Sequence, residues 1–244
     1  MNGLLYIRFE LLRTFRNRRF FIFSFGFPLV LYFLIAGPQR NVENLAGTGI
    51  PAPLYYMVGL ASFGTMASMI SSGARISAER QAGWTRQLRI TPLSPRQYFR
   101  AKVASSYAMA ICSLLLLYLA GTALGVSLAA HEWVEMTALI LVALLPFAAL
   151  GITLGHLVNV ESVGPLTGGL LAILAFLSGT WFPLTHGFLY DVGQYLPGYW
   201  IVQAGHIAIH GRAWGVEGWT VVIVWTVVLV ILGRTAYRRD TARV

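Results

Sequence analysis

Six stretches of this chain are apolar and nearly free of charge, and each is close to the length that a helix needs to cross a bilayer, which is about 20 residues. They cover residues 20–37, 54–76, 103–126, 136–155, 162–181 and 214–233. Only 11% of the residues are charged, whereas soluble domains carry about a quarter. We therefore predict an all-α integral membrane protein with six transmembrane helices, forming a single domain over residues 1–244.

The basic residues indicate how this protein is oriented. Of its 18 lysine and arginine residues, all but Arg40 and Arg212 lie before the first span, around the connection between the second and third spans, or after the sixth. Loops rich in lysine and arginine remain in the cytoplasm. We therefore expect both termini and the connection 77–102 on the cytoplasmic side of a multi-pass plasma-membrane protein.

Two further segments are expected to be helical without crossing the membrane. Residues 1–19 place Leu4, Ile7 and Leu11 on one helix face, with Glu10 and Arg13 on the other. This pattern predicts an amphipathic helix in the cytoplasmic interface. Residues 182–212 are apolar but interrupted by prolines, glycines and polar side chains. We expect them to form a re-entrant segment on the outer side, where protein covers the broken backbone.

The connection 77–102 has its own local structure signals. Trp84 and Leu88 are four residues apart and would share one helix face. That helix has to end before Pro92, because a proline disfavours helical backbone in the residue before it. Ser94-Pro95-Arg96-Gln97 then matches a capping box with proline at the first helical position. We interpret the connection as a docking surface with an aromatic anchor; the alternative is a solvated basic loop.

The same connection resembles the signature loop of the ABC-2 type permeases, the membrane subunits of drug, antibiotic and polysaccharide exporters. The matching residues are Glu79-Arg80, Gly83, Arg86, Leu88-Arg89, Thr91-Pro92-Leu93-Ser94-Pro95, Tyr98 and Lys102. A second set of matches lies between spans five and six, at Ser178-Gly179, Phe182-Pro183 and Leu196-Pro197. The resemblance extends over the whole chain, although its short loops leave no room for a separate carbohydrate-binding domain.

The resemblance implies that the connection carries a coupling helix, which would sit in a groove of a separate ATPase subunit. The residues that would carry this role are Glu79, Arg80, Gly83, Trp84, Arg86, Leu88 and Arg89. The implied assembly has two ATPase copies and a second permease, identical or homologous to this one. It would move a small amphipathic molecule, such as a drug, antibiotic or lipid, out of the cytoplasm or inner leaflet.

Catalytic and cofactor sites are not expected in this chain. A nucleotide-binding P-loop needs a lysine followed by serine or threonine, whereas Lys102 is the single lysine and precedes Val103. ATP and magnesium would therefore bind the partner subunit. The lone Cys112 gives no metal-ligand cluster, and His206 and His210 lack an evident third ligand. We do not expect an enzyme, because the sequence shows no Ser/His/Asp or paired-carboxylate arrangement in a plausible pocket. We do not expect a nucleic-acid-binding protein either, because there is no soluble basic domain.

Two other classes of protein stay open. One is an ATP-independent secondary transporter or channel. Such a protein would use charged residues in its spans, and we find no Asp, Glu, Lys or Arg well within any predicted span, which counts against proton coupling. The other is a membrane assembly subunit, which would not need a structured 77–102 connection.

Overall fold

The structure is a computed structural model that describes residues 3–16, 22–84, 87, 93–207 and 214–242. The described residues form helices and connections, without a β-strand. The α-helices are α1 (Gly3–Phe15), α3 (Phe27–Ala36), α4 (Ala52–Ile70), α5 (Ser72–Gln81), α7 (Pro95–Ala123), α8 (Ala130–Ala143), α9 (Leu145–Leu157), α10 (Val160–Leu177), α11 (Phe188–Gly193), α12 (Pro197–Gln203) and α14 (Val216–Ala242). Short π or 3-10 turns cover Ile22–Gly26 (η1), Leu45–Gly47 (η2) and Ala204–His206 (η3).

Five helical segments in the described residues are long and apolar enough to cross a membrane. They are Ala52–Gln81, Pro95–Ala123, Ala130–Leu157, Val160–Leu177 and Val216–Asp240. The first predicted span, 20–37, corresponds to a shorter apolar helix, Ser24–Ala36. The all-helical class is thus confirmed, and five of the six predicted spans have helices of membrane-crossing length.

The fourth predicted span, 136–155, is two helices rather than one. Helix α8 ends at Ala143 and α9 begins at Leu145, with Pro146 in its first turn. A proline lacks the backbone N–H that would continue the α8 hydrogen-bond ladder. The break between α8 and α9 therefore follows from the sequence at a position that the length of the apolar run alone does not reveal.

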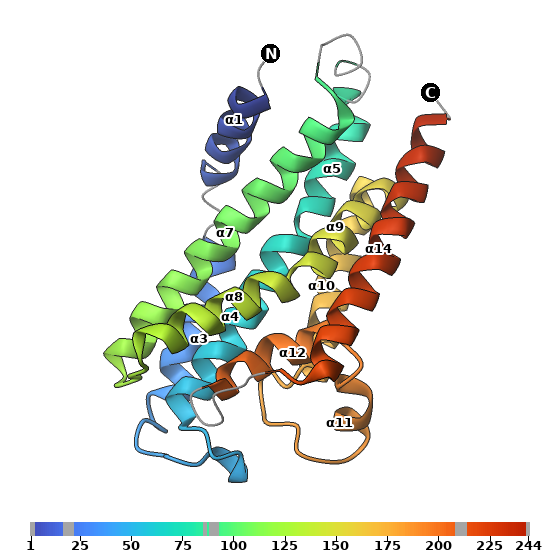
Figure 1. Cartoon of the computed structure of the whole chain (residues 1–244). Coiled ribbons are helices and arrows are strands. Elements are labelled where there is room, and N and C mark those ends of the chain that lie inside the picture. The colour runs from blue at the N-terminus through green and yellow to red at the C-terminus, as the bar shows by residue number, and fades with distance from the viewer. Residues whose placement is uncertain (1–2, 17–21, 85–86, 88–92, 208–213, 243–244) are drawn as a thin grey trace.

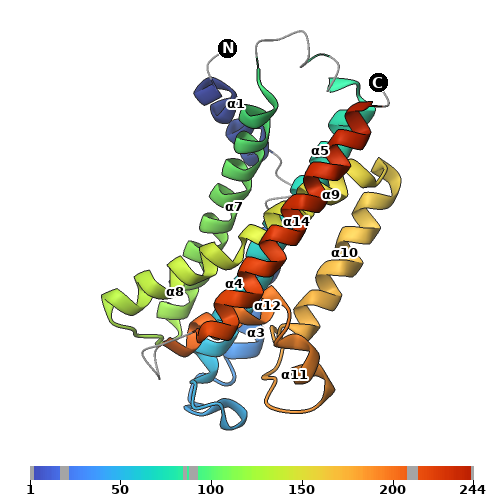
Figure 2. The same cartoon turned by 45° about the vertical axis from the view of Figure 1, so that its right-hand side comes forward.

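Helix α4 forms the centre of the molecule, and 17 of its residues are buried. It packs against α3, α7, α9 and α12. In contrast, α10 and α14 leave most of their residues exposed, and α10 lies to one side of the other helices (Figure 2). The broad exposed faces of these two helices are apolar, which suits contact with lipid or with another membrane protein.

Helices α5 and α9 touch backbone to backbone through glycines. A Cβ atom added to Gly73 would lie 2.5 Å from the Gly151 carbonyl oxygen, and one added to Gly155 would lie 2.7 Å from Cβ of Ile76. Small residues allow helices in membranes to approach this closely. The α5–α9 contact leaves no space for a side chain at these positions.

The elements that carry most of the described lysine and arginine residues lie at one end of the molecule (Figure 1). We call one end the basic end: it contains α1, the end of α5, the start of α7 and the last turns of α14. The opposite end contains η2, α11 and α12. There the indole of Trp214 donates to the Trp200 carbonyl at 2.7 Å, and that of Trp225 donates to the Tyr195 carbonyl at 2.8 Å. These bonds hold the short helices of the 182–212 segment against α14.

Candidate functional site

The last turn of α5 leads into the predicted coupling segment at the basic end. Helix α5 ends at Gln81, and Gly83 follows with a φ of 71°. This left-handed backbone favours glycine and commonly terminates a helix. The next residue, Trp84, is 36% exposed. The chain therefore turns at Gly83, and the Trp84 side chain is partly exposed while it hydrogen-bonds Tyr6 of α1.

Glu79 points away from that surface and into a buried ion cluster, which we define as Glu10, Glu79 and Lys102. The three side chains come from α1, α5 and α7, and each is at most 4% exposed. Lys102 Nζ donates to Glu10 Oε1 at 2.7 Å and to Glu79 Oε1 at 2.5 Å. The Tyr98 hydroxyl donates to the other Glu79 carboxylate oxygen at 2.7 Å.

Two arginines complete the surroundings of this buried ion cluster. Arg75 of α5 donates to the Thr14 hydroxyl at 2.8 Å and to the Ser106 hydroxyl at 3.2 Å. Arg13, on the exposed side, donates to Glu79 at 2.7 Å. Together with Lys102, the half-buried Arg75 balances the two buried carboxylates. This balance is what buried charges require, because an uncompensated ion in a low-dielectric interior is costly.

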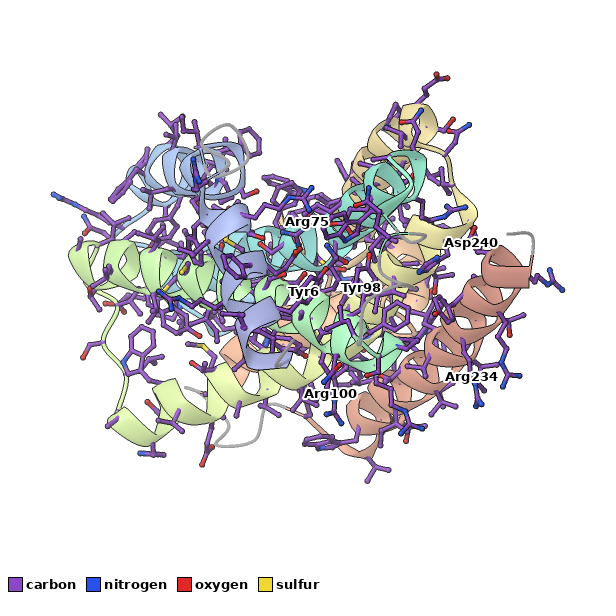
Figure 3. All side chains as sticks on the ribbon, turned by 90° about the horizontal axis from the view of Figure 1, so that it is seen from above. Tyr6, Arg75, Tyr98, Arg100, Arg234 and Asp240 are labelled. Atoms are coloured by element: carbon purple, nitrogen blue, oxygen red, sulfur yellow. The ribbon has the colours of Figure 1, made fainter. Side chains whose placement is uncertain are left out.

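Aromatic rings cover the same cluster. The ring centroids of Tyr6 and Tyr98 are 6.3 Å apart, and Lys102 Nζ lies 5.3 Å from the Tyr98 ring centroid. Burial raises the pKa of Tyr6 to about 12, so its phenol is neutral at physiological pH. Viewed from the basic end, α1 crosses α7 beside Tyr6, Tyr98 and Arg75 (Figure 3).

Arg80, the next residue after Glu79, points the other way, toward α9 and α14. It donates to the Asp240 carboxylate at 2.6 Å and to the Gly155 carbonyl oxygen at 2.9 Å. The second Asp240 oxygen lies 3.0 Å from Nδ1 of His156. Adjacent residues of one turn thus bind opposite sides of the molecule: Glu79 binds α1 and α7, whereas Arg80 binds α9 and α14.

The structure describes four of the seven predicted coupling residues. Glu79 is buried and Arg80 is partly buried, so in this conformation both bind helices of the same chain. Gly83 ends α5, and Trp84 lies at the surface. Arg86, Leu88 and Arg89 lie outside the described residues, as does His210. Among the described residues, no group of three or more His, Cys, Asp or Glu side chains could hold a metal ion.

The sequence analysis did not include Glu10 and Lys102 among the site residues. Glu79 and Lys102 lie just outside the predicted spans 54–76 and 103–126, but within the long helical segments Ala52–Gln81 and Pro95–Ala123, and both are buried. The physical reason is that each charge finds its counter-ion on a different helix. A lysine one residue before an apolar run was the available signal.

Comparisons with known proteins agree with this architecture. Residues 51–234 match the family described as "ABC-2 family transporter protein". The chain is also similar to "Putative transport permease YvfS" of Bacillus subtilis (strain 168), with 25% identity over 241 residues and 96% of each chain covered. The family match covers more than half of the chain, and with it the α5 turn, the connection to α7, and helices α7 and α9 that bind the turn. This chain is therefore a membrane protein of the ABC-2 transporter family.

Proposed function

We propose that this chain is the membrane-spanning permease subunit of an ABC exporter, driven by ATP hydrolysis in a separate subunit. Proteins of the ABC-2 family typically work with such an ATPase. The working unit would contain two ATPase copies and a second permease, identical or homologous. In this assembly the basic end faces the cytoplasm, and Ser24–Ala36 adds a sixth crossing that brings both termini to that side.

The observation that carries the proposal is the pair Glu79 and Arg80, in the last turn of α5 before Gly83 and the partly exposed Trp84. A partner docked on Gly83, Trp84 and the residues that follow would pull on the last turn of α5. The displacement would pass through Glu79 to α1 and α7. It would pass through Arg80 to α9 and α14. In this mechanism Trp84 contacts the partner, while Glu79 and Arg80 transmit the motion inside the permease.

A small amphipathic substrate, such as a drug, an antibiotic or a lipid, suits this chain. The exposed side chains of α10 and α14 are mostly aliphatic or aromatic, and they include Leu166, Ile173, Phe176, Ile223 and Val227. Such surfaces have little to offer a strongly polar solute. The proposed direction is outward, from the cytoplasm or the inner leaflet, as in the exporters that the signature loop resembles.

Gentle purification from the native membrane tests the proposal. The full tagged chain is solubilised, and the proteins that remain bound are identified. We expect a stoichiometric soluble ATPase, which is lost when Trp84 is replaced in Trp84→Asp. Phe188→Asp is the matched control, because Phe188 is 75% exposed on α11 at the opposite end.

Two outcomes would contradict the proposal in different ways. A chain that purifies alone and still moves solute after reconstitution in vesicles would be an ATP-independent transporter. An ATPase that stays bound to Trp84→Asp as firmly as to Phe188→Asp would place its docking surface elsewhere, although the exporter assignment would stand.

A further inference from the structure

The buried ion cluster joins three helices that are distant in sequence. Lys102 is the only lysine among the 18 basic residues of the chain, and it is fully buried. An ammonium is a compact charge with three donors, whereas the planar guanidinium of arginine suits one bidentate partner. A lysine is therefore the cation that can bridge two carboxylates from different helices, as Lys102 does with Glu10 and Glu79.

The folded protein does not need such a cluster for its stability. Replacing a buried ion pair by neutral or apolar groups of similar volume is often without cost, or stabilising. What a buried pair does provide, in the best-supported cases, is a unique relative placement of the elements that it joins. The elements joined here are α1, α7 and the turn of α5 that precedes the coupling segment.

The interface helix α1 depends on polar contacts for its position against α5. Its main packing partner among the described helices is α7. The opposite face of α1 exposes Leu5, Phe9 and Leu12. Its hydrogen bonds to α5 are Arg13–Glu79 and Thr14–Arg75, Lys102 links Glu10 to Glu79, and Tyr6 belongs to a small apolar cluster that includes Ile76 of α5. Without the polar contacts, Tyr6 would be the main side chain that joins α1 to the α5 turn, through the Ile76 cluster and Trp84.

We propose that Lys102 is the positioning residue that fixes α1 to the coupling turn, so that α1 belongs to the unit that the ATPase moves. The proposal rests on the proposed function, because it assigns a role in the same coupling. Lys102 contacts neither the ATPase nor the substrate. It acts by making Glu79 and Glu10 share one counter-ion, so that a displacement of the α5 turn carries α1 with it.

Two variants separate positioning from folding. Lys102→Met leaves two carboxylates facing each other without their shared cation, and we expect its apparent Tm to fall by about 6–20 °C. The triple variant Lys102→Met, Glu10→Gln, Glu79→Gln removes all three charges at nearly constant volume. We expect its Tm to recover most of that loss, because the two facing carboxylates are gone, while Arg75 loses its counter-charges and keeps its hydrogen bonds to Thr14 and Ser106.

The distance between α1 and the end of α5 is then measured by double electron–electron resonance, with spin labels at Leu12→Cys and Gln81→Cys in a Cys112→Ser background. Leu12 and Gln81 are both exposed, so labels there do not disturb packing. In the purified chain we expect one narrow distance for the wild type. The stable triple variant should give a broad distribution, although a purely structural cluster would leave it narrow.

The ATPase complex supplies the second readout. With ATP and vanadate, the wild-type distance should stay single, because α1 and α5 move together, and the triple variant should show two populations. A triple variant that keeps one narrow distance in the chain and in the trapped complex would overturn the proposal. If no ATPase co-purifies with the wild type, the proposed function fails, and the isolated chain still decides whether Lys102 positions α1.

Discussion

Replacing Gly151 by alanine tests how closely α9 approaches the α4–α5 junction. The new Cβ would lie 2.6 Å from the Met69 carbonyl oxygen and 2.6 Å from the Ser72 hydroxyl oxygen. The Ser72 hydroxyl itself donates to Met69 at 2.8 Å, so it cannot turn away without losing that bond. The backbone oxygen can move only with its helix. Gly151→Ala therefore has to push α9 away from the α4–α5 junction.

The size of the effect follows from two opposing contributions. Overpacking a tight interior costs about 1–3 kcal/mol, and two contacts below 3.0 Å place Gly151→Ala near the upper value. Replacing glycine by alanine in a helix stabilises it by about 1 kcal/mol. The expected net loss is about 2 kcal/mol, which corresponds to a fall in Tm of about 4–8 °C for a chain of this size.

Gly168→Ala on α10 is the matched control, because a Cβ there would meet nothing within 4 Å. It gains the helix propensity without the clash, so its Tm should stay constant or rise by up to about 4 °C. The assay is the loss of the monodisperse peak in size-exclusion chromatography after heating the detergent-solubilised protein. Equal Tm values for the two variants would refute the inference that α9 packs tightly against the α4–α5 junction.

Three further substitutions probe other features. Ser94→Ala removes the cap on the Gln97 amide; we expect a loss of about 1 kcal/mol in the free energy of unfolding, with Ser94→Asp close to wild type in the same heating assay. Tyr55→Phe leaves the buried Gly179 carbonyl without its donor and should cost about 1–3 kcal/mol, seen as a lower Tm. Asp240→Asn weakens a partly exposed ion pair; we expect faster hydrogen exchange in the last turns of α14 and a Tm change below about 3 °C.

Local signals in the sequence predicted local structure well. The capping box at Ser94 is present, with Gln97 binding back to the Ser94 amide, and α7 begins at Pro95 as expected. Apolar runs identified the long helices because bilayer thickness fixes their minimum length. The first run, 20–37, begins outside the described residues, and the chain is helical from Ile22 to Ala36.

The charged site could not be predicted, because its partners come from distant parts of the chain. Periodicity placed Glu10 on the polar side of α1, which implied solvent, yet Glu10 is buried against α7. Only the packing of α1 across α7 brings Glu10, Glu79 and Lys102 together. Likewise, the resemblance implied a coupling role for Arg80 but did not reveal its counter-ion Asp240, which lies 160 residues further along the chain.

The central position of α4 has a consequence for how this protein is made. Of the five long helices in the described residues, the one that contains α4 has the lowest hydropathy and the largest buried share. Its own sequence therefore gives the insertion machinery the weakest signal, and its stable place depends on helices that are synthesised after it. We expect α4 to remain beside the translocon until α7 and α9 emerge. Defects in biogenesis should then concentrate in this segment.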